Sequence, residues 1–214
     1  MDGPLIAFTG WEVRGGKGSA AGAVEEFGLH APSGTDEARY ELLAVGGRGF
    51  HPPRLLRTVG VGADASGEEE ATPPGCAGLR ATWTAQYRFL VETAPATTVA
   101  YAVYLLGVNP PEGATAAELA AFDEFYTTVH LPEVAARRQA LRAVRLELVT
   151  EVRAPHLGAP RYLALYEVDE RGAAQRRHVG PPYTSGPPVW QGHRVAWRLW
   201  YRRLVGGGSA TAKG

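Results

Sequence analysis

A histidine, a tyrosine and an aspartate lie close together in one stretch with a helical pattern. Tyr126 and His130 are four residues apart, so their side chains share one face of a helix, and Asp123 lies three residues before Tyr126. A phenol beside an imidazole can polarise a carbonyl or relay a proton. The carboxylate of Asp123 can orient the imidazole as a hydrogen-bond acceptor. We therefore take His130, Tyr126 and Asp123 as candidate catalytic residues.

Each of these residues also has a purely structural interpretation. Pro132 disfavours a helical conformation at Leu131, so we expect the helix to stop or kink near His130. At such an end the helix dipole favours a protonated imidazole and raises its pKa. The ring can equally cap free carbonyls or pack beneath a sheet. Tyr126 can belong to the apolar stripe of the helix, and Asp123 can be a solvated charge.

Aromatic residues recur along the segments predicted to be strands. If they face a shared interior, they make a stacking cavity for a flat ligand, whereas core packing is the alternative for each one. An arginine among them can anchor a phenolate or a carboxylate, or it can be an exposed strand charge. The candidate substrate-binding residues are Trp83, Tyr87, Arg88, Tyr104, Tyr166, Trp190, His193 and Trp197.

The elements that must position these residues follow from periodicity. Thr115 and Glu118 form a capping-box pattern that begins the central helix. An apolar stripe at helical spacing then runs through it, and a second helical stretch is expected over 133–141. A Pro- and Gly-rich excursion covers 170–192, and an exposed acidic loop covers 63–78. Strands are predicted over 4–13, 53–62, 81–91, 99–108, 143–153, 161–169 and 193–204, and a short helix over 35–46.

The two halves of the chain have similar element orders. The second half reads β–α–β–β–loop–β, and the first half gives a rougher version of the same order. His51-Pro52-Pro53 weakly echoes the His130-Leu-Pro pattern. We therefore consider a degenerate tandem duplication, with one half over 1–95, a second over 99–204, and a flexible tail over 205–214.

Composition excludes several classes of function. The chain has 214 residues with 22 acidic and 22 basic side chains, so no excess charge favours nucleic acid or an anionic membrane. It has no run of about 18 apolar residues and no signal-peptide pattern at its start. A single cysteine, Cys76, excludes an internal disulfide framework and fits a cytoplasmic location. No spacing typical of metal ligands is present, so no metal is expected.

The segment F-D-E-F-Y-T-T-V-H-L-P-E over 122–133, followed by R-Y-L-A-L-Y-E over 161–167, resembles the dimeric α+β barrel superfamily. It is most similar to the EthD-like branch, whose members carry the pattern F-x-x-W-Y-x-x-x-H-x-P-E on the first helix. Phe125 stands where tryptophan is usual, and the resemblance covers about 99–204. The matching positions are Phe122, Tyr126, His130, Pro132 and Glu133.

The resemblance implies an α+β fold, a ferredoxin-like dimeric α+β barrel around an apolar cavity, in a homodimer. Whether the barrel closes within one chain or across a dimer is open. Similar proteins include ring-opening oxygenases of angucycline-type biosynthesis. The implied function is oxygenation of an aromatic polyketide-like molecule, with no tightly bound cofactor or with reduced flavin from a partner reductase. The alternatives are a polyketide cyclase or dehydratase that uses the His/Tyr pair, and a non-catalytic small-molecule or haem-binding protein.

Overall fold

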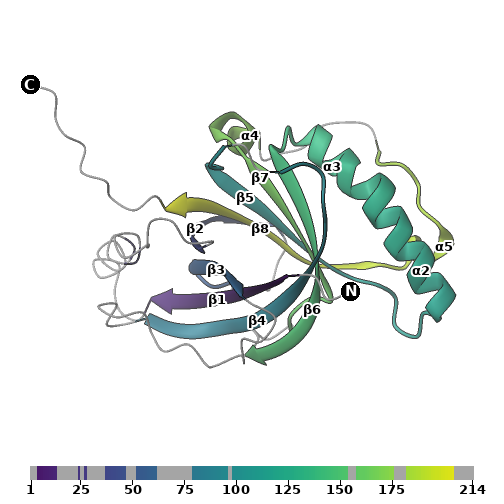
Figure 1. Cartoon of the computed structure of the whole chain (residues 1–214), viewed down its shortest axis with the longest axis horizontal. Coiled ribbons are helices and arrows are strands. Elements are labelled where there is room, and N and C mark those ends of the chain that lie inside the picture. The colour runs from purple at the N-terminus through teal and green to yellow at the C-terminus, as the bar shows by residue number, and fades with distance from the viewer. Residues whose placement is uncertain are drawn as a thin grey trace, which may run out of the picture.

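The computed structural model describes residues 4–13, 24, 27, 37–46, 52–61, 79–95, 98–153, 158–175 and 182–204. Its eight described strands form a closed antiparallel barrel in the order β1-β3-β2-β8-β5-β7-β6-β4 (Figure 1). The barrel therefore closes within one chain, and the expected homodimer is not needed to complete it. The strands are β1 Leu5–Val13, β2 Glu37–Val45, β3 Leu55–Val61, β4 Leu79–Glu92, β5 Ala102–Asn109, β6 Arg142–Arg153, β7 Tyr162–Val168 and β8 Arg194–Leu204.

The first four strands and the last four follow the same order around the barrel. One set reads β4-β1-β3-β2 and the other reads β8-β5-β7-β6. The two sets join through antiparallel pairs β2–β8 and β4–β6. This order is the one expected of two ferredoxin-like units. The ferredoxin-like assignment, the duplication and the 1–95/99–204 division stay predictions, because most of residues 14–36 lies outside the described part.

Ion pairs across the two junctions are reciprocal. Arg88 of β4 pairs with Glu147 of β6 at 2.6 Å, and Arg202 of β8 pairs with Glu41 of β2 at 2.7 Å. A second arginine approaches each carboxylate. Arg161 lies 3.4 Å from Glu147, and Arg54 lies 3.3 Å from Glu41. The two halves of the barrel are thus related by an approximate twofold axis, which equates 88 with 202, 147 with 41, and 161 with 54.

The central helix lies on the outer face of the barrel beside β5, β6 and β7 (Figure 1). It comprises α2 Ala116–Phe125, the π-turn η1 Tyr126–His130, and α3 Leu131–Arg137. The predicted Thr115–Glu118 capping box is confirmed. Of the predicted stop or kink near His130, the stop is wrong, because the helix continues through Pro132, and the π-turn interrupts the regular α-helix there. The second helical stretch, predicted over 133–141, is α3, which ends at Arg137.

Two of the predicted segments differ from the structure in their secondary structure. The predicted helix over 35–46 is wrong, because this segment forms β2, which pairs with β3 and β8 on its two sides. Tertiary pairing overrides the capping signal of its acidic start. The predicted excursion over 170–192 contains two short helices, α4 Glu170–Ala174 and α5 Pro188–Gln191. The other predicted strands are confirmed within a few residues of their expected ends.

The core has two main layers. One fills the barrel interior, where Trp83 of β4 meets Trp197 of β8 edge to face, with ring centroids 4.8 Å apart. These strands lie opposite each other in the barrel order, so the two indoles plug the interior. The other layer lies between the outer face of the sheet and the central helix. The aromatic residues are divided between these two layers.

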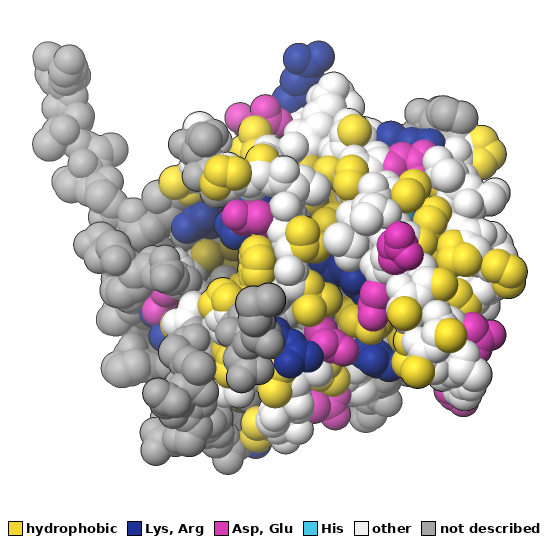
Figure 2. Space-filling view, turned by 45° about the vertical axis from the view of Figure 1, so that its right-hand side comes forward, with side chains coloured by type: hydrophobic (Ala, Val, Ile, Leu, Met, Phe, Trp, Pro, Cys, Tyr) yellow, Lys and Arg dark blue, Asp and Glu magenta, His cyan; other side chains and the backbone are white. Residues whose placement is uncertain are grey.

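Acidic and basic side chains are interspersed on the helix side of the molecule, in accord with the balanced composition (Figure 2). Across the described residues, no helix has the length and apolarity needed to cross a membrane. His51, Cys76, the predicted loop over 63–78 and the predicted tail over 205–214 lie outside the described residues.

Candidate functional site

A cavity of about 360 Å³ lies outside the barrel, between the central helix and the outer face of β5 and β8. A segment over 182–193, here called the strap, forms its third wall. The lining combines aromatic, imidazole and guanidinium groups, which suits an aromatic ligand with a polar substituent. The polar and aromatic lining residues are Tyr104, His130, Arg138, Tyr183, Thr184, Ser185, Trp190, Gln191, His193 and Arg198.

The π-turn directs His130 into this cavity. Leu131 N–H bonds to the carbonyl of Tyr126, five residues back, in the π-helical manner. The Thr128 hydroxyl donates to the carbonyl of Glu124 at 2.7 Å, which helps satisfy the backbone where the α-helical pattern is interrupted. The inserted turn rotates the following residues, so that His130 joins the buried face of the helix. The ring is only 8% exposed.

His130 is surrounded by aromatic rings. Its centroid lies 4.6 Å from Trp190, 5.3 Å from Tyr183 and 5.5 Å from Tyr126. Among the described residues, nothing forms a hydrogen bond with its buried Nδ1. Burial, with a smaller contribution from the nearby imidazole of His193, lowers the pKa of His130 to about 4. The expected rise in pKa is therefore wrong, because the helix does not end here and burial dominates. His130 is neutral at pH 7.

His193 contributes a second imidazole to the same cavity. Its Nδ1 lies 2.5 Å from the carbonyl oxygen of Trp190. Because a carbonyl only accepts, Nδ1 carries the proton, and Nε2 of the neutral ring keeps its lone pair. The indole of Trp190 stacks on His193 at 4.3 Å and also contacts His130. His193 and Trp190, both candidate substrate-binding residues, thus lie beside His130 in one cavity.

The strap is fastened to the central helix by one carboxylate and one guanidinium. The Thr184 N–H donates to Glu133 at 3.0 Å. Arg137 donates to Glu133 and, at 3.0 Å, to the carbonyl of Pro182, and it lies 4.2 Å over the ring of Tyr183. These contacts hold Tyr183 against His130. Glu133 therefore organises this wall of the cavity.

Gly186 allows the strap to pack closely. A Cβ atom at this position would lie 2.5 Å from Cγ of Trp190 and 2.7 Å from Cε1 of Phe125. Both are far closer than ordinary carbon contacts. A larger residue would therefore push Trp190 out of the cavity wall.

Tyr126 lies behind His130 rather than in the cavity lining. It is fully buried, its hydroxyl neighbours that of Tyr166, and burial raises the pKa of both phenols. The guanidinium of Arg145 lies 4.6 Å over the Tyr126 ring. Tyr104 stacks between Tyr166 and Trp200, so Tyr166 supports the cavity floor through Tyr104.

Asp123 does not orient His130, contrary to expectation. Its carboxylate pairs with Arg145 at 2.5 Å and accepts from the Tyr162 hydroxyl at 3.2 Å. Arg145 is almost fully buried in the outer face of the sheet, and the ion pair satisfies its charge. Asp123 thus fastens α2 to β6 and β7.

Four of the predicted substrate-binding residues lie away from this cavity. Trp83, Tyr87 and Trp197 fill the barrel interior, since strand alternation places them on the inner face. Arg88 pairs with Glu147 outside the cavity. The sequence interpretation also missed Arg138 and Tyr183. The sequence feature that could have indicated Tyr183 is the i,i+4 pair of Glu133 and Arg137. This pair places a carboxylate and a guanidinium on one helix face, where they bind the strap that carries Tyr183.

The described part of the chain contains no group of three or more His, Cys, Asp or Glu side chains able to hold a metal ion. No protein-family model matches this sequence, and no curated protein matches it. Among solved structures, a chlorite dismutase mutant from Candidatus Nitrospira defluvii in complex with cyanide covers 94% of this chain and 91% of its own chain. Its sequence identity is 11% and its TM-score is 0.44. At this level of likeness no function or cofactor is transferred.

Proposed function

We propose that this chain is an enzyme that binds an aromatic carbon acid or phenol in the helix–sheet cavity and oxygenates it. The single observation behind the proposal is the neutral, buried imidazole of His130 in a cavity walled by aromatic rings. A neutral imidazole can accept a proton, and the arginines of the lining can stabilise the anion that results. An aromatic polyketide is the substrate class that the family resemblance implies.

The low pKa of His130 constrains how the proton moves. Burial makes the imidazole a weak base. Negative charge that develops on a bound substrate raises the affinity of the ring for the proton, so transfer accompanies charge development. Arg198 and Arg138 line the cavity and can hold the developing oxyanion. The substrate anion then forms a C–O bond with dioxygen and supplies both electrons, so the reaction needs no metal and no flavin.

Anthrone is a suitable probe because it is a flat carbon acid, and its oxidation consumes one O2 to give anthraquinone and water. We expect the protein to accelerate anthraquinone formation under air and not under argon. His130→Gln should lower the rate by about 10²–10⁴, the usual contribution of a general base. Arg88→Gln, outside the cavity, is the matched control and should leave the rate unchanged. Absence of acceleration under air would reject the oxygenase proposal.

The same cavity can also support acid–base chemistry without oxygen. Two imidazoles contact one indole, and His193 carries its proton on Nδ1, so the site holds two groups that can exchange protons with a ligand. A cyclase or dehydratase would use this pair. Product formed equally under air and argon from a substrate with an enolisable ketone would favour this second function.

A further inference from the structure

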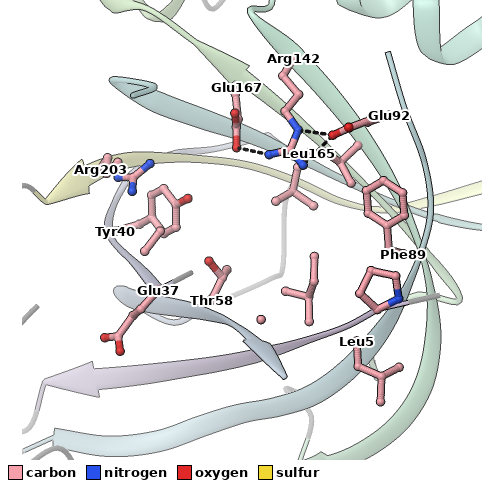
Figure 3. Close-up of a pocket in the computed structure, with 15 residues that line it drawn as sticks. Leu5, Glu37, Tyr40, Thr58, Phe89, Glu92, Arg142, Leu165, Glu167 and Arg203 are labelled. Atoms are coloured by element: carbon pink, nitrogen blue, oxygen red, sulfur yellow. Dashed lines mark hydrogen bonds and ion pairs between the residues drawn. The ribbon is translucent and has the colours of Figure 1, made fainter. Parts of the chain in front are cut away.

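A second cavity, of about 480 Å³, lies inside the barrel at the end opposite the plug made by Trp83 and Trp197. It is found where β4 and β8 end and where β2 and β6 begin (Figure 3). The central helix takes no part in its lining. Nothing in the proposed function uses this cavity.

The approximate twofold axis passes along the barrel, yet the two halves line this cavity with different chemistry. Equating Arg88 with Arg202 makes Phe89 the counterpart of Arg203. A phenyl ring therefore stands on one side of the cavity, and a guanidinium stands at the matching position opposite. A charged side chain that faces a barrel interior is costly unless it has a partner.

The same asymmetry recurs on the neighbouring strands. Equating Arg54 with Arg161 makes Thr58 of β3 the counterpart of Leu165 of β7. Tyr40 of β2 pairs directly with Arg203 across the β2–β8 ladder, so their side chains share the inner face. Figure 3 shows Tyr40, Thr58 and Arg203 on one side of the cavity, with Phe89 and Leu165 on the other. Polar groups thus gather around Arg203, whereas Phe89 and Leu165 offer an apolar surface opposite, beside the Arg142–Glu92 ion pair.

Most charges in this cavity already have partners. Arg142 pairs with Glu92 at 2.7 Å and approaches Glu167 at 3.7 Å. Glu37 accepts from Arg39 at 2.6 Å and from Arg57 at 2.9 Å.

The guanidinium of Arg203 differs from these groups in its lack of a partner in the described part of the chain. Within the described residues, no hydrogen bond or ion pair reaches its guanidinium, although its charge lowers the pKa of the Tyr40 phenol and of Glu167 against the larger effect of burial. The lining holds three carboxylates, those of Glu37, Glu92 and Glu167, and two guanidiniums, and among these described residues Arg203 is the guanidinium without an ion-pair partner. Beside it stand the hydroxyls of Tyr40 and Thr58, which can donate hydrogen bonds.

We propose that this cavity binds a small monocarboxylate with an apolar body. The carboxylate accepts from the guanidinium of Arg203, with Tyr40 and Thr58 as additional donors. The apolar body lies against Phe89 and Leu165 and fills the space above the indole plug. This site is separate from the His130 cavity, and the barrel wall lies between them.

Octanoate is the probe, with octan-1-ol and octylamine as ligands of equal chain length. In calorimetric titrations at pH 7, we expect octanoate to bind at least tenfold more tightly than octan-1-ol, and octylamine to bind more weakly than either. A lack of saturable octanoate binding, or equal affinities for the three, would overturn the proposal.

Arg203→Phe copies the residue at the matching position of the other half. It should weaken octanoate binding at least tenfold and leave octan-1-ol binding within threefold. Arg203→Gln keeps a polar side chain and should give the same loss, which covers the case that the phenylalanine variant does not fold. Arg198→Gln, in the other cavity, is the control and should bind octanoate as the parent does. Unchanged octanoate affinity in the folded Arg203 variant would overturn the assignment.

Discussion

The hydroxyl of Tyr87 donates a hydrogen bond to the carbonyl oxygen of Pro160 at 2.9 Å. Tyr201, its counterpart in the other half, donates to the carbonyl of Pro53 at 2.8 Å. Each tyrosine comes from one half of the barrel and each proline from the other. These two bonds therefore join the halves reciprocally, and each is buried.

Removing either hydroxyl should destabilise the barrel by a similar amount. Tyr87→Phe and Tyr201→Phe each leave a buried carbonyl without its donor, which costs about 1–2 kcal/mol. The double variant should lose about the sum, because the two bonds share no atoms. Urea unfolding followed by tryptophan fluorescence measures these free energies. A loss in only one of the two single variants would contradict the reciprocal role.

The strap should control substrate affinity more than the chemical step. Glu133→Gln weakens the acceptor for Thr184 and for Arg137, so Tyr183 and Trp190 lose their fixed positions. We expect KM for anthrone to rise about five- to tenfold, with kcat changed less than threefold. Glu124→Gln, on the exposed side of the same helix, is the matched control. A fall in kcat with unchanged KM would show that Glu133 acts on the chemical step.

Gly186→Ala should damage the cavity without changing any polar group. The added Cβ would overlap Trp190 and Phe125, so the indole must move. Overpacking of this kind costs about 1–3 kcal/mol. The rate of anthrone turnover should fall. The quenching of tryptophan fluorescence by bound anthrone should fall as well. Glu124→Gln, on the exposed side of the central helix, is the control and should leave both unaltered.

The low pKa of His130 makes a prediction about stability and pH. The folded-state pKa, about 4, lies below the unfolded value of 6.5, so the contribution is fully present above pH 6.5. It is lost as the pH falls from 6.5 towards 4, because only the unfolded chain takes up the proton. At pH 5 the loss is about 2 kcal/mol relative to pH 7. His130→Gln should lack this part of the pH dependence in urea titrations, and identical slopes would contradict the low pKa.

Much of the fold follows from local pattern. Strand alternation places Trp83, Tyr87 and Trp197 on one face, and the capping box begins the central helix where predicted. The predicted helix stop is wrong because Pro132 lies in the first turn of α3, directly after the π-turn, where its missing N–H is tolerated. Only the folded packing selects that turn. The helix predicted over 35–46 is wrong because the segment is stabilised as a strand by pairing with β3 and β8. Residues of β8 are distant in sequence, so local pattern does not indicate this pairing.

The site was predictable in part. His130, Tyr104, Trp190 and His193 share one cavity, as an aromatic site around the helix predicts. The sequence does not reveal which face of each strand meets the helix and which faces the barrel interior. A single aromatic cavity was therefore predicted, whereas the aromatic residues form two separate layers. The role of Asp123 depends on Arg145, a long-range partner that periodicity does not indicate.

Proton removal by His130 is tested most directly by hydrogen exchange at the acidic carbon of anthrone, in D2O under argon, followed by proton NMR. Oxygen is absent, so the measurement isolates the first step from the oxidation. We predict that the protein raises the exchange rate above that in buffer and that Arg88→Gln raises it equally. The acceleration by His130→Gln should be at least 100-fold smaller. Equal exchange rates for His130→Gln and the parent protein would contradict the assignment of His130 as the base.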